Sequence, residues 1–289
     1  MQISANGVAI EVDDVGRGEP LLLLMGLGMQ LVSWPEELVN DLVARGYRVI
    51  RIDNRDCGLS QSFDHFGKPR MFSATVRYML GLRVPSPYSL ADMARDSLGV
   101  LEALGIESAH VCGASMGGMI AQHMAVLQPA RVSRLTLMMT TSGSRSLPQP
   151  SARIRTALLG RPSNPHDIES IVEYLEHMFA LIGSPAYKTD RELFRRRLRA
   201  IVQRAWRPTG VARQLIAIAA DGDRTAMLGR IAAPTHIVHG DADPLVPVAA
   251  AHQLKRKIPG ATLEIIEGMG HDLPVPLLPR LAQAIDRRA

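Results

Sequence analysis

A repeated alternation of short apolar runs with helical patterns constrains the fold of this 289-residue chain most strongly. Continuous apolar runs such as PLLLL at 20–24 and THIVH at 235–239 are typical of strands that are buried on both faces of a sheet. The segments between such runs carry apolar residues at helical spacing, and Ser33 and Ser89 are the expected N-caps of two of them. Because strands that alternate with helices usually run parallel, the pattern predicts an α/β fold with a mostly parallel central sheet flanked by helices.

Two regions depart from this alternation. The first 20 residues alternate in polarity around Asn6-Gly7, a dipeptide that tight turns favour, so we expect an N-terminal antiparallel hairpin. From about residue 144 to residue 230 the chain shows amphipathic helices and proline-containing loops but no buried strand. We therefore expect a discontinuous core of residues 1–143 and 231–289, with a helical cap of residues 144–230 inserted after the sixth strand.

Composition and charge give no indication of a nucleic-acid, zinc or membrane partner. The net charge is +5, and the densest basic run, FRRRLRAIVQR at 194–204, lies in a helical pattern without interleaved aromatic residues. This pattern favours a solvated cap helix over a patch that attracts anionic ligands or surfaces, and we expect no nucleic-acid partner. Cys57 and Cys112 form neither a disulfide framework nor a zinc motif. With no leader pattern and no long apolar run, we expect a cytoplasmic chain without stable membrane insertion, either monomeric or homo-oligomeric.

The stretch GASMG at 113–117 is the first candidate for chemistry, because it lies between a predicted strand and a predicted helix. In that context a G-x-S-x-G turn holds its serine at a strained position, and Gly113 and Gly117 relieve the crowding around it. The N–H of Met116 would open the helix without an intrahelical partner and would face a developing oxyanion. The alternative is a glycine-rich connection in which Ser115 only caps the helix.

A serine hydroxyl is a weak nucleophile until a base removes its proton, so this chemistry requires a histidine elsewhere in the chain. His271 is the first choice because it lies in EGMGHDLP, in the loop after the last predicted strand. His239 precedes a turn and is the second choice. The histidines within strand or helix patterns are expected to be packed or surface residues: His110, His123 and His236.

The orienting carboxylate is expected in HGDADPLVP at 239–247, which follows another predicted strand. Asp243 is favoured because it lies in the loop beyond the strand, whereas Asp241 directly follows a glycine and is expected to serve the turn. Asp272 is expected to be a surface or turn residue. The predicted catalytic residues are therefore Ser115, Asp243 and His271.

The chain order serine, aspartate, histidine resembles that of the α/β-hydrolase fold family. The resemblance extends over essentially the whole length and rests on GASMGG, HGDADPLVP, GMGH and DNRDCGLS, the last with Asp56 in place of a usual glycine. It implies a second oxyanion donor, the backbone N–H of Leu27 in LLMGLGM, where Met25 stands at a position that is often histidine. Gly26 and Gly28 lack the third glycine of a dinucleotide site, and we expect no cofactor or metal.

The resemblance also implies an activity. A serine nucleophile is typical of carboxylesterases, and the chain is similar to bacterial hydrolases near the polyketide methylesterases. We expect a serine hydrolase that cleaves carboxylic esters of small to medium, largely apolar substrates through an acyl-enzyme on Ser115. The alternatives are a lactonase, a carbon–carbon bond hydrolase, an acyltransferase, a cofactor-free perhydrolase, or a non-catalytic ligand receptor on the same fold.

Overall fold

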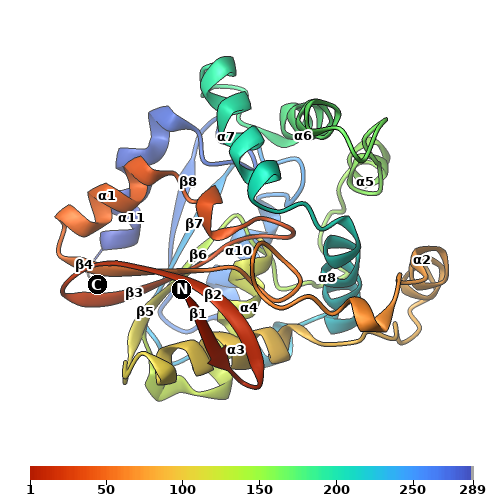
Figure 1. The fold of residues 1–289 in the computed structure, drawn as a ribbon. Helices are drawn as coiled ribbons and strands as arrows, with labels where there is room; N and C mark the ends of the chain where they lie inside the picture. The colour runs from red at the N-terminus through yellow and green to blue at the C-terminus, as the bar shows by residue number, and fades with distance from the viewer. Residues whose placement is uncertain (288–289) are drawn as a thin grey trace.

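A single eight-stranded sheet forms the centre of the computed structural model, which describes residues 1–287 (Figure 1). The strand order is β1-β2-β4-β3-β5-β6-β7-β8. The strands are β1 (Gln2–Ala5), β2 (Val8–Gly16), β3 (Glu19–Leu24), β4 (Tyr47–Ile52), β5 (Ala109–Ala114), β6 (Val132–Met138), β7 (Thr235–Gly240) and β8 (Thr262–Ile266).

The direction of the strands matches the expected fold class. β1 pairs with β2, and β2 with β4, in antiparallel register, whereas every pairing from β4 through β8 is parallel. Asn6 and Gly7 form the turn between β1 and β2 with φ of 52° and 73°. Both angles are the left-handed values that this kind of hairpin turn requires. The predicted N-terminal hairpin and parallel sheet are thus confirmed.

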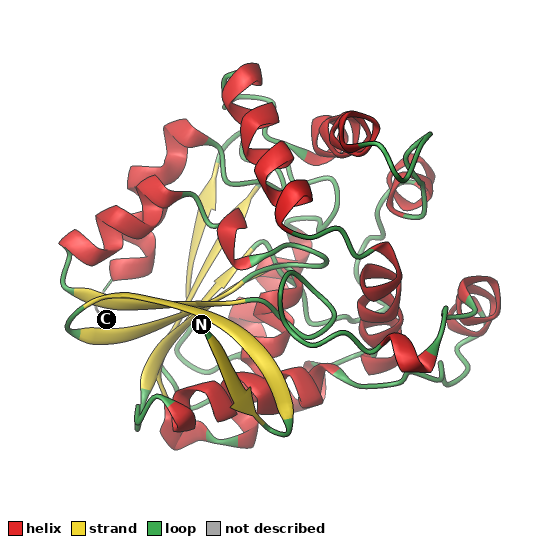
Figure 2. Ribbon diagram, viewed as in Figure 1, coloured by secondary structure: helices red, strands yellow, loops and turns green. Residues whose placement is uncertain are grey.

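Helices cover both faces of the sheet (Figure 2). One apolar cluster packs α3 (Leu90–Ala103), α4 (Met116–Leu127) and α10 (Ala249–Lys257) against one face. A second cluster packs α1 (Glu36–Ala44) and α11 (Leu278–Asp286) against the other face. Short 3-10 helices complete the connections: η1 (Leu31–Ser33), η2 (Asp64–Phe66), η3 (Pro129–Arg131) and η4 (Val275–Leu277).

The two expected serine caps have different outcomes. Ser89 forms a reciprocal capping box with Asp92 at the start of α3, as expected. The prediction for Ser33 is wrong, because Ser33 ends η1 and α1 begins only at Glu36, after Pro35. Trp34 is extended, with φ of −71° and ψ of 117°. A residue before proline is disfavoured in the α region, so a helix cannot run from Ser33 through Trp34.

The chain between β6 and β7 contains helices and no strand. We call α5 to α9 the inserted helices: α5 (Ala152–Leu158), α6 (Ile168–Ile182), α7 (Arg191–Arg204), α8 (Pro208–Asp221) and α9 (Thr225–Leu228). The basic run lies on α7, where Arg195 and Arg199 pair with Glu169 of α6. A further helix, α2 (Met71–Met79), packs against α8 at the periphery of the molecule (Figure 1). No helix within residues 1–287 combines the length and the apolar character that a membrane span needs.

Candidate active site

The turn after β5 holds Ser115 in a strained conformation at the C-terminal end of this central strand. Its φ is 54° and its ψ is −119°, a combination that non-glycine residues rarely adopt. A Cβ on Gly113 would lie 2.3 Å from the carbonyl oxygen of Gly117, and one on Gly117 would lie 2.0 Å from that of Leu24. Both glycines are therefore required by close backbone contacts around Ser115.

Three side chains from three strand ends form a continuous hydrogen-bonded chain. Nε2 of His271 lies 3.0 Å from Oγ of Ser115, and Nδ1 of His271 lies 2.7 Å from Oδ2 of Asp243. The other oxygen of Asp243 accepts the backbone N–H groups of Leu245 and Val246 at 2.9 and 2.8 Å. These bonds fix the carboxylate, which in turn orients the imidazole ring toward Ser115.

The other candidates for acid and base have different partners. Oδ1 of Asp241 accepts the N–H of Gly268 at 2.7 Å, as expected of a turn residue. Nε2 of His239 lies 2.7 Å from the carbonyl oxygen of Val246 and 3.6 Å from Asp243. Burial lowers the pKa of His239, which favours a neutral ring that donates to this carbonyl. The structure thus brings neither side chain to Ser115.

Asp272 lies in a bend, as expected of a turn residue, but it is only partly exposed. Its Oδ1 accepts the N–H and the hydroxyl of Ser184 at 3.0 and 2.5 Å. Burial raises the pKa of Asp272 even though these hydrogen bonds act in the opposite direction. The reason is tertiary, because Ser184 follows α6 and the inserted segment covers Asp272. Nothing in the sequence around Asp272 indicates that cover.

Two backbone N–H groups beside Ser115 have no protein acceptor within residues 1–287, those of Leu27 and Met116. Met116 is the first residue of α4, where an N–H has no intrahelical partner. Leu27 follows Gly26, and a Cβ on Gly26 would lie 3.1 Å from Cβ of Ser115. The loop after β3 therefore passes directly beside the Ser115 turn, and both predicted donor groups lie at this junction.

The comparisons with known proteins agree with this architecture. The family model described as the alpha/beta hydrolase fold matches residues 19–275. This chain belongs to that family. It is 32% identical to rhodomycin D methylesterase DnrP of Streptomyces peucetius, over 92% of this chain and 89% of that protein. It is 30% identical to a 2-hydroxy-6-oxononadienedioate/2-hydroxy-6-oxononatrienedioate hydrolase of Cupriavidus pinatubonensis (strain JMP 134 / LMG 1197), over 91% of this chain and 84% of that protein.

Solved structures show the same fold for this hydrolase. The esterase EaEST from Exiguobacterium antarcticum superposes with a TM-score of 0.76 at 23% identity, covering 99% of this chain and 97% of that one. The S103A mutant of the meta-cleavage product hydrolase CumD from Pseudomonas fluorescens IP01 gives 0.75 at 22% identity, covering 99% and 95%. The predicted family and fold class are confirmed, and the chain is a hydrolase.

In this hydrolase the loop after β3 is held by side chains from other elements. Nδ2 of Asn54 donates to the carbonyl of Met25 at 3.1 Å. Oε1 of Gln214, on α8, accepts the N–H of Gly28 at 2.8 Å, and its Nε2 donates to the carbonyl of Arg55 at 2.8 Å. Gln214 is fully buried, and sequence reasoning did not identify it. The only local signal is a single amide in the apolar pattern of α8, VARQLIAIA.

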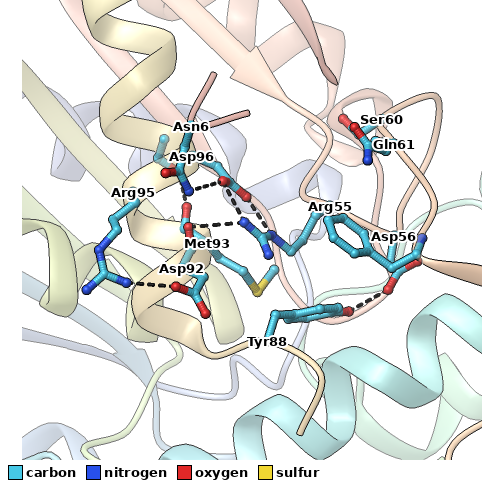
Figure 3. Close-up of polar contacts among 12 residues, drawn as sticks. Asn6, Arg55, Asp56, Ser60, Gln61, Tyr88, Asp92, Met93, Arg95 and Asp96 are labelled. Carbon is cyan, nitrogen blue, oxygen red and sulfur yellow. Dashed lines mark hydrogen bonds and ion pairs between the residues drawn. The ribbon is translucent and has the colours of Figure 1, made fainter. Parts of the chain in front are cut away.

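Asp56, which replaces the usual glycine, anchors α8 to the core of the hydrolase. Its φ of 66° lies in the left-handed region, which aspartate tolerates better than most residues. Both carboxylate oxygens bind the guanidinium of Arg213, each at 2.7 Å, and both side chains are buried. The hydroxyl of Tyr88 also donates to Asp56 at 2.7 Å (Figure 3). Asp56 thus joins the loop after β4 to the helix that carries Gln214.

The neighbouring Arg55 ties the same loop to α3. Its Nε and Nη2 atoms donate to the carboxylate of Asp96 at 2.6 and 2.7 Å. Figure 3 shows how the two side chains face each other. Asn6, from the N-terminal hairpin, donates to Asp96 at 2.9 Å. Burial raises the pKa of Asp96, although the charge of Arg55 opposes that effect. The loop between Asp53 and Ser60 is consequently fixed on both sides.

A cleft of about 1780 Å³ reaches Ser115 and His271. Its walls come from the core loops, α2 and the inserted helices, and they are largely apolar. The lining includes Met178, Phe179, Leu181 and Trp206 of the inserted segment. Within the described residues, no cluster of three His, Cys, Asp or Glu side chains is arranged to hold a metal ion.

Proposed function

We propose that this hydrolase cleaves carboxylic esters through an acyl-enzyme formed on Ser115. The observation that carries the proposal is the chain of two hydrogen bonds, 3.0 Å from Ser115 to His271 and 2.7 Å from His271 to Asp243. A histidine held in this way can accept the serine proton while the carboxylate stabilises the resulting imidazolium. The strained turn contributes by exposing Oγ to the cleft.

In the proposed cycle, His271 accepts the Ser115 proton as Oγ attacks the ester carbonyl carbon. The oxyanion of the tetrahedral intermediate forms beside the N–H groups of Leu27 and Met116. The intermediate then expels the alcohol, which takes its proton from His271, and an acyl group remains on Ser115. Water attacks this acyl group with His271 as base, which releases the acid and restores the serine. Every proton moves through His271, so the cycle uses no metal or organic cofactor.

The proposed substrate is an ester with a bulky, apolar acyl group and a small alcohol. The cleft of about 1780 Å³ exceeds the range of about 300 to 1,000 Å³ that is common for small-molecule sites. This size favours a larger acyl group than the small to medium substrates expected from sequence. The relative at 32% identity is named a methylesterase of rhodomycin D, which supports a methyl ester.

A carbon–carbon bond hydrolase is the second candidate, because another relative, at 30% identity, is named as a hydrolase of an oxo-dienedioate. Such a substrate carries two carboxylates, and the largely apolar cleft is also lined by cations, among them Arg155, Lys188 and Arg197. A carboxylate that pairs with such a cation is compensated for its lost hydration. The lining therefore accommodates both candidates, and the comparison of turnover below separates them.

We also propose that residues 144–230 act as a cap that completes the acyl pocket. Nε2 of Gln30 donates to the carbonyls of Ile201 and Ala205 at 2.8 and 2.7 Å, which ties the loop after β3 to the end of α7. The N–H of His271 donates to the carbonyl of Ile182 at 2.7 Å, which ties the histidine loop to α6. These contacts support a cap whose helices α6 and α7 are fixed to the two loops that carry Leu27 and His271.

The test compares turnover of methyl esters with bulky apolar acyl groups, p-nitrophenyl esters of increasing acyl length, and an oxo-dienedioate. Ser115→Ala should lower ester turnover by several orders of magnitude, and a serine-directed phosphonate should label Ser115 in the wild type. Ser97→Ala is the matched control, because Ser97 is a buried serine on α3 that bonds only the carbonyl of Met93. Unchanged turnover in Ser115→Ala, faster cleavage of the dienedioate, or tight binding without turnover would each contradict the proposal.

A further inference from the structure

Helix α2 is apolar on both of its faces. Ala74 and Tyr78 belong to the cluster that packs against α8. On the opposite face, Phe72 is 84% exposed and Met79 is 77% exposed, and Val76 lies between them on the same side of the helix. The polar residues of α2 are Ser73, Thr75 and Arg77, and the apolar face of a helix is normally buried. The outer face of α2 thus has the composition of a covered surface.

Further exposed apolar side chains precede and follow α2 along the chain. Of the twelve large apolar side chains exposed among the described residues, six lie within the 17 residues from 66 to 82. We call these six residues the α2 patch: Phe66, Phe72, Val76, Met79, Leu80 and Leu82. Single exposed apolar residues are ordinary, whereas such a concentration marks an interaction surface. Figure 1 shows α2 at the periphery of the molecule, beyond α8.

The charge around the α2 patch has one sign. Lys68, Arg70, Arg77 and Arg83 precede, interrupt and follow the apolar residues, and no aspartate or glutamate occurs from residue 65 to residue 91. None of these four cations forms an ion pair with any described residue. Asp64, the nearest acidic residue before the patch, is paired with the buried Arg213. The four cations are therefore available to an anionic partner.

We propose that the α2 patch docks on a lipid bilayer that contains anionic headgroups. Membrane-surface helices combine an apolar face with lysine and arginine, and each of these signals alone gives only weak binding. A second copy of this chain fits the surface less well. In a symmetric dimer the patch would face itself, which would bring four unpaired cations against four others.

Helix α2 lies between the proposed docking surface and the cleft. Met71, Ala74, Thr75 and Tyr78 of α2 line the same cleft as Ser115, whereas no residue of the α2 patch does. One helix thus separates the cleft from the docking surface. An apolar ester dissolved in the bilayer would reach Ser115 past α2. This last step rests on the proposed esterase activity, but the docking itself does not.

The experiment measures co-sedimentation with vesicles of phosphatidylcholine alone and with vesicles of equal parts phosphatidylcholine and phosphatidylglycerol. The wild type should sediment with the anionic vesicles, less at high salt, and weakly with the neutral ones. Phe72→Ser/Met79→Ser should reduce the bound fraction about tenfold or more, because it removes two apolar side chains from the contact. Arg70→Gln/Arg83→Gln should reduce the preference for anionic vesicles, because it removes two of the four cations.

The matched control is Leu127→Ser/Ile168→Ser, which removes two exposed apolar side chains outside the α2 patch and should leave vesicle binding unchanged. Circular dichroism and the melting temperature verify the fold of each variant, whether or not an ester substrate is found. Three outcomes would overturn the proposal. They are no binding to anionic vesicles, binding that Phe72→Ser/Met79→Ser does not reduce, and a concentration-dependent dimer that this substitution abolishes without any vesicle binding.

Discussion

The two turns that meet at the candidate oxyanion site are held in place by different means. The turn around Ser115 is fixed by close backbone contacts, since Gly113 and Gly117 permit approaches within the turn and to Leu24 of β3 that no side chain could enter. The loop that carries Leu27 is fixed from outside, by Asn54 and by Gln214 of α8. One half of the site is thus specified by backbone contacts within the core, and the other half depends on the inserted helices. This difference gives each half its own sensitivity to mutation.

The largest effect on turnover is expected at the turn around Ser115. Gly117→Ala places a Cβ 2.0 Å from the carbonyl oxygen of Leu24, a backbone atom that cannot move without displacing β3. We expect turnover to fall at least about 100-fold and the free energy of unfolding to fall by about 1 to 3 kcal/mol. Urea unfolding and ester kinetics measure both quantities.

Gly229→Ala is the matched control for that substitution. Gly229 has a helical φ of −65° and nothing within 4 Å of a built Cβ. We expect stability and turnover to be unchanged or slightly higher, because alanine restricts the unfolded chain. Equal effects at both positions would show that the Ser115 turn is not specified by close contacts.

The anchor of the other half is the buried pair of Asp56 and Arg213. Arg213→Leu leaves the carboxylate of Asp56 without its cation, and removing one partner of a buried pair costs about 3 to 5 kcal/mol. The double variant Asp56→Gly/Arg213→Leu removes both charges and restores a glycine at a φ of 66°. We expect the double variant to be more stable than Arg213→Leu alone, by urea unfolding. A double variant that is less stable than Arg213→Leu would show that the pair of Asp56 and Arg213 is not the anchor of α8.

The direct contact of α8 with the loop after β3 is expected to have a smaller effect. Gln214→Ala leaves the N–H of Gly28 without its acceptor, so kcat should fall about tenfold while KM changes little, because the loop is needed most in the transition state. Gln214→Glu keeps an acceptor for Gly28 and should retain more activity than Gln214→Ala. If Gln214→Ala has wild-type kcat, the loop after β3 is rigid by itself. That result would contradict the claim that this loop depends on the inserted helices.

The smallest effect concerns the far end of α8, where Asp221 bonds His123 of α4 at 2.9 Å. Burial alone would raise the pKa of Asp221, but His123 and Arg224 outweigh it and lower the pKa below the ordinary 3.8. The ionised form is thus favoured in the folded state, and its contribution to stability is complete above pH 3.8 and is lost as the pH falls through the lowered value. Asp221→Asn should be less stable at neutral pH and should lose less stability on acidification. An acid-unfolding series that is parallel for the two proteins would contradict this expectation.

Local signals in the sequence were sufficient for most of the fold. Apolar runs predicted the strands, and Asn6-Gly7 and Ser89 predicted a turn and a helix start that the structure contains. The error at Ser33 arose because the preference of a serine for the N-cap was weighed without the constraint that Pro35 places on Trp34. Both effects are local, so that error was avoidable.

The candidate site was predictable in part. Ser115, Asp243 and His271 each follow a strand, and parallel strands end at one edge of the sheet, which is why sequence reasoning could group them. Gln214 and the cover over Asp272 were not predictable, because they depend on contacts between residues 186 and 88 positions apart. No local pattern encodes such contacts.

The amino-acid sequence alone determined where the backbone must turn, which runs must be buried, and that a serine lies in a strained strand-to-helix turn. These features follow from sterics and hydrophobic periodicity over a few residues. The tertiary structure decided which carboxylate meets His271, what holds the loop of Leu27, and which face of α2 stays open. Those outcomes depend on how distant helices pack over the sheet edge, because packing brings together side chains that lie far apart along the chain.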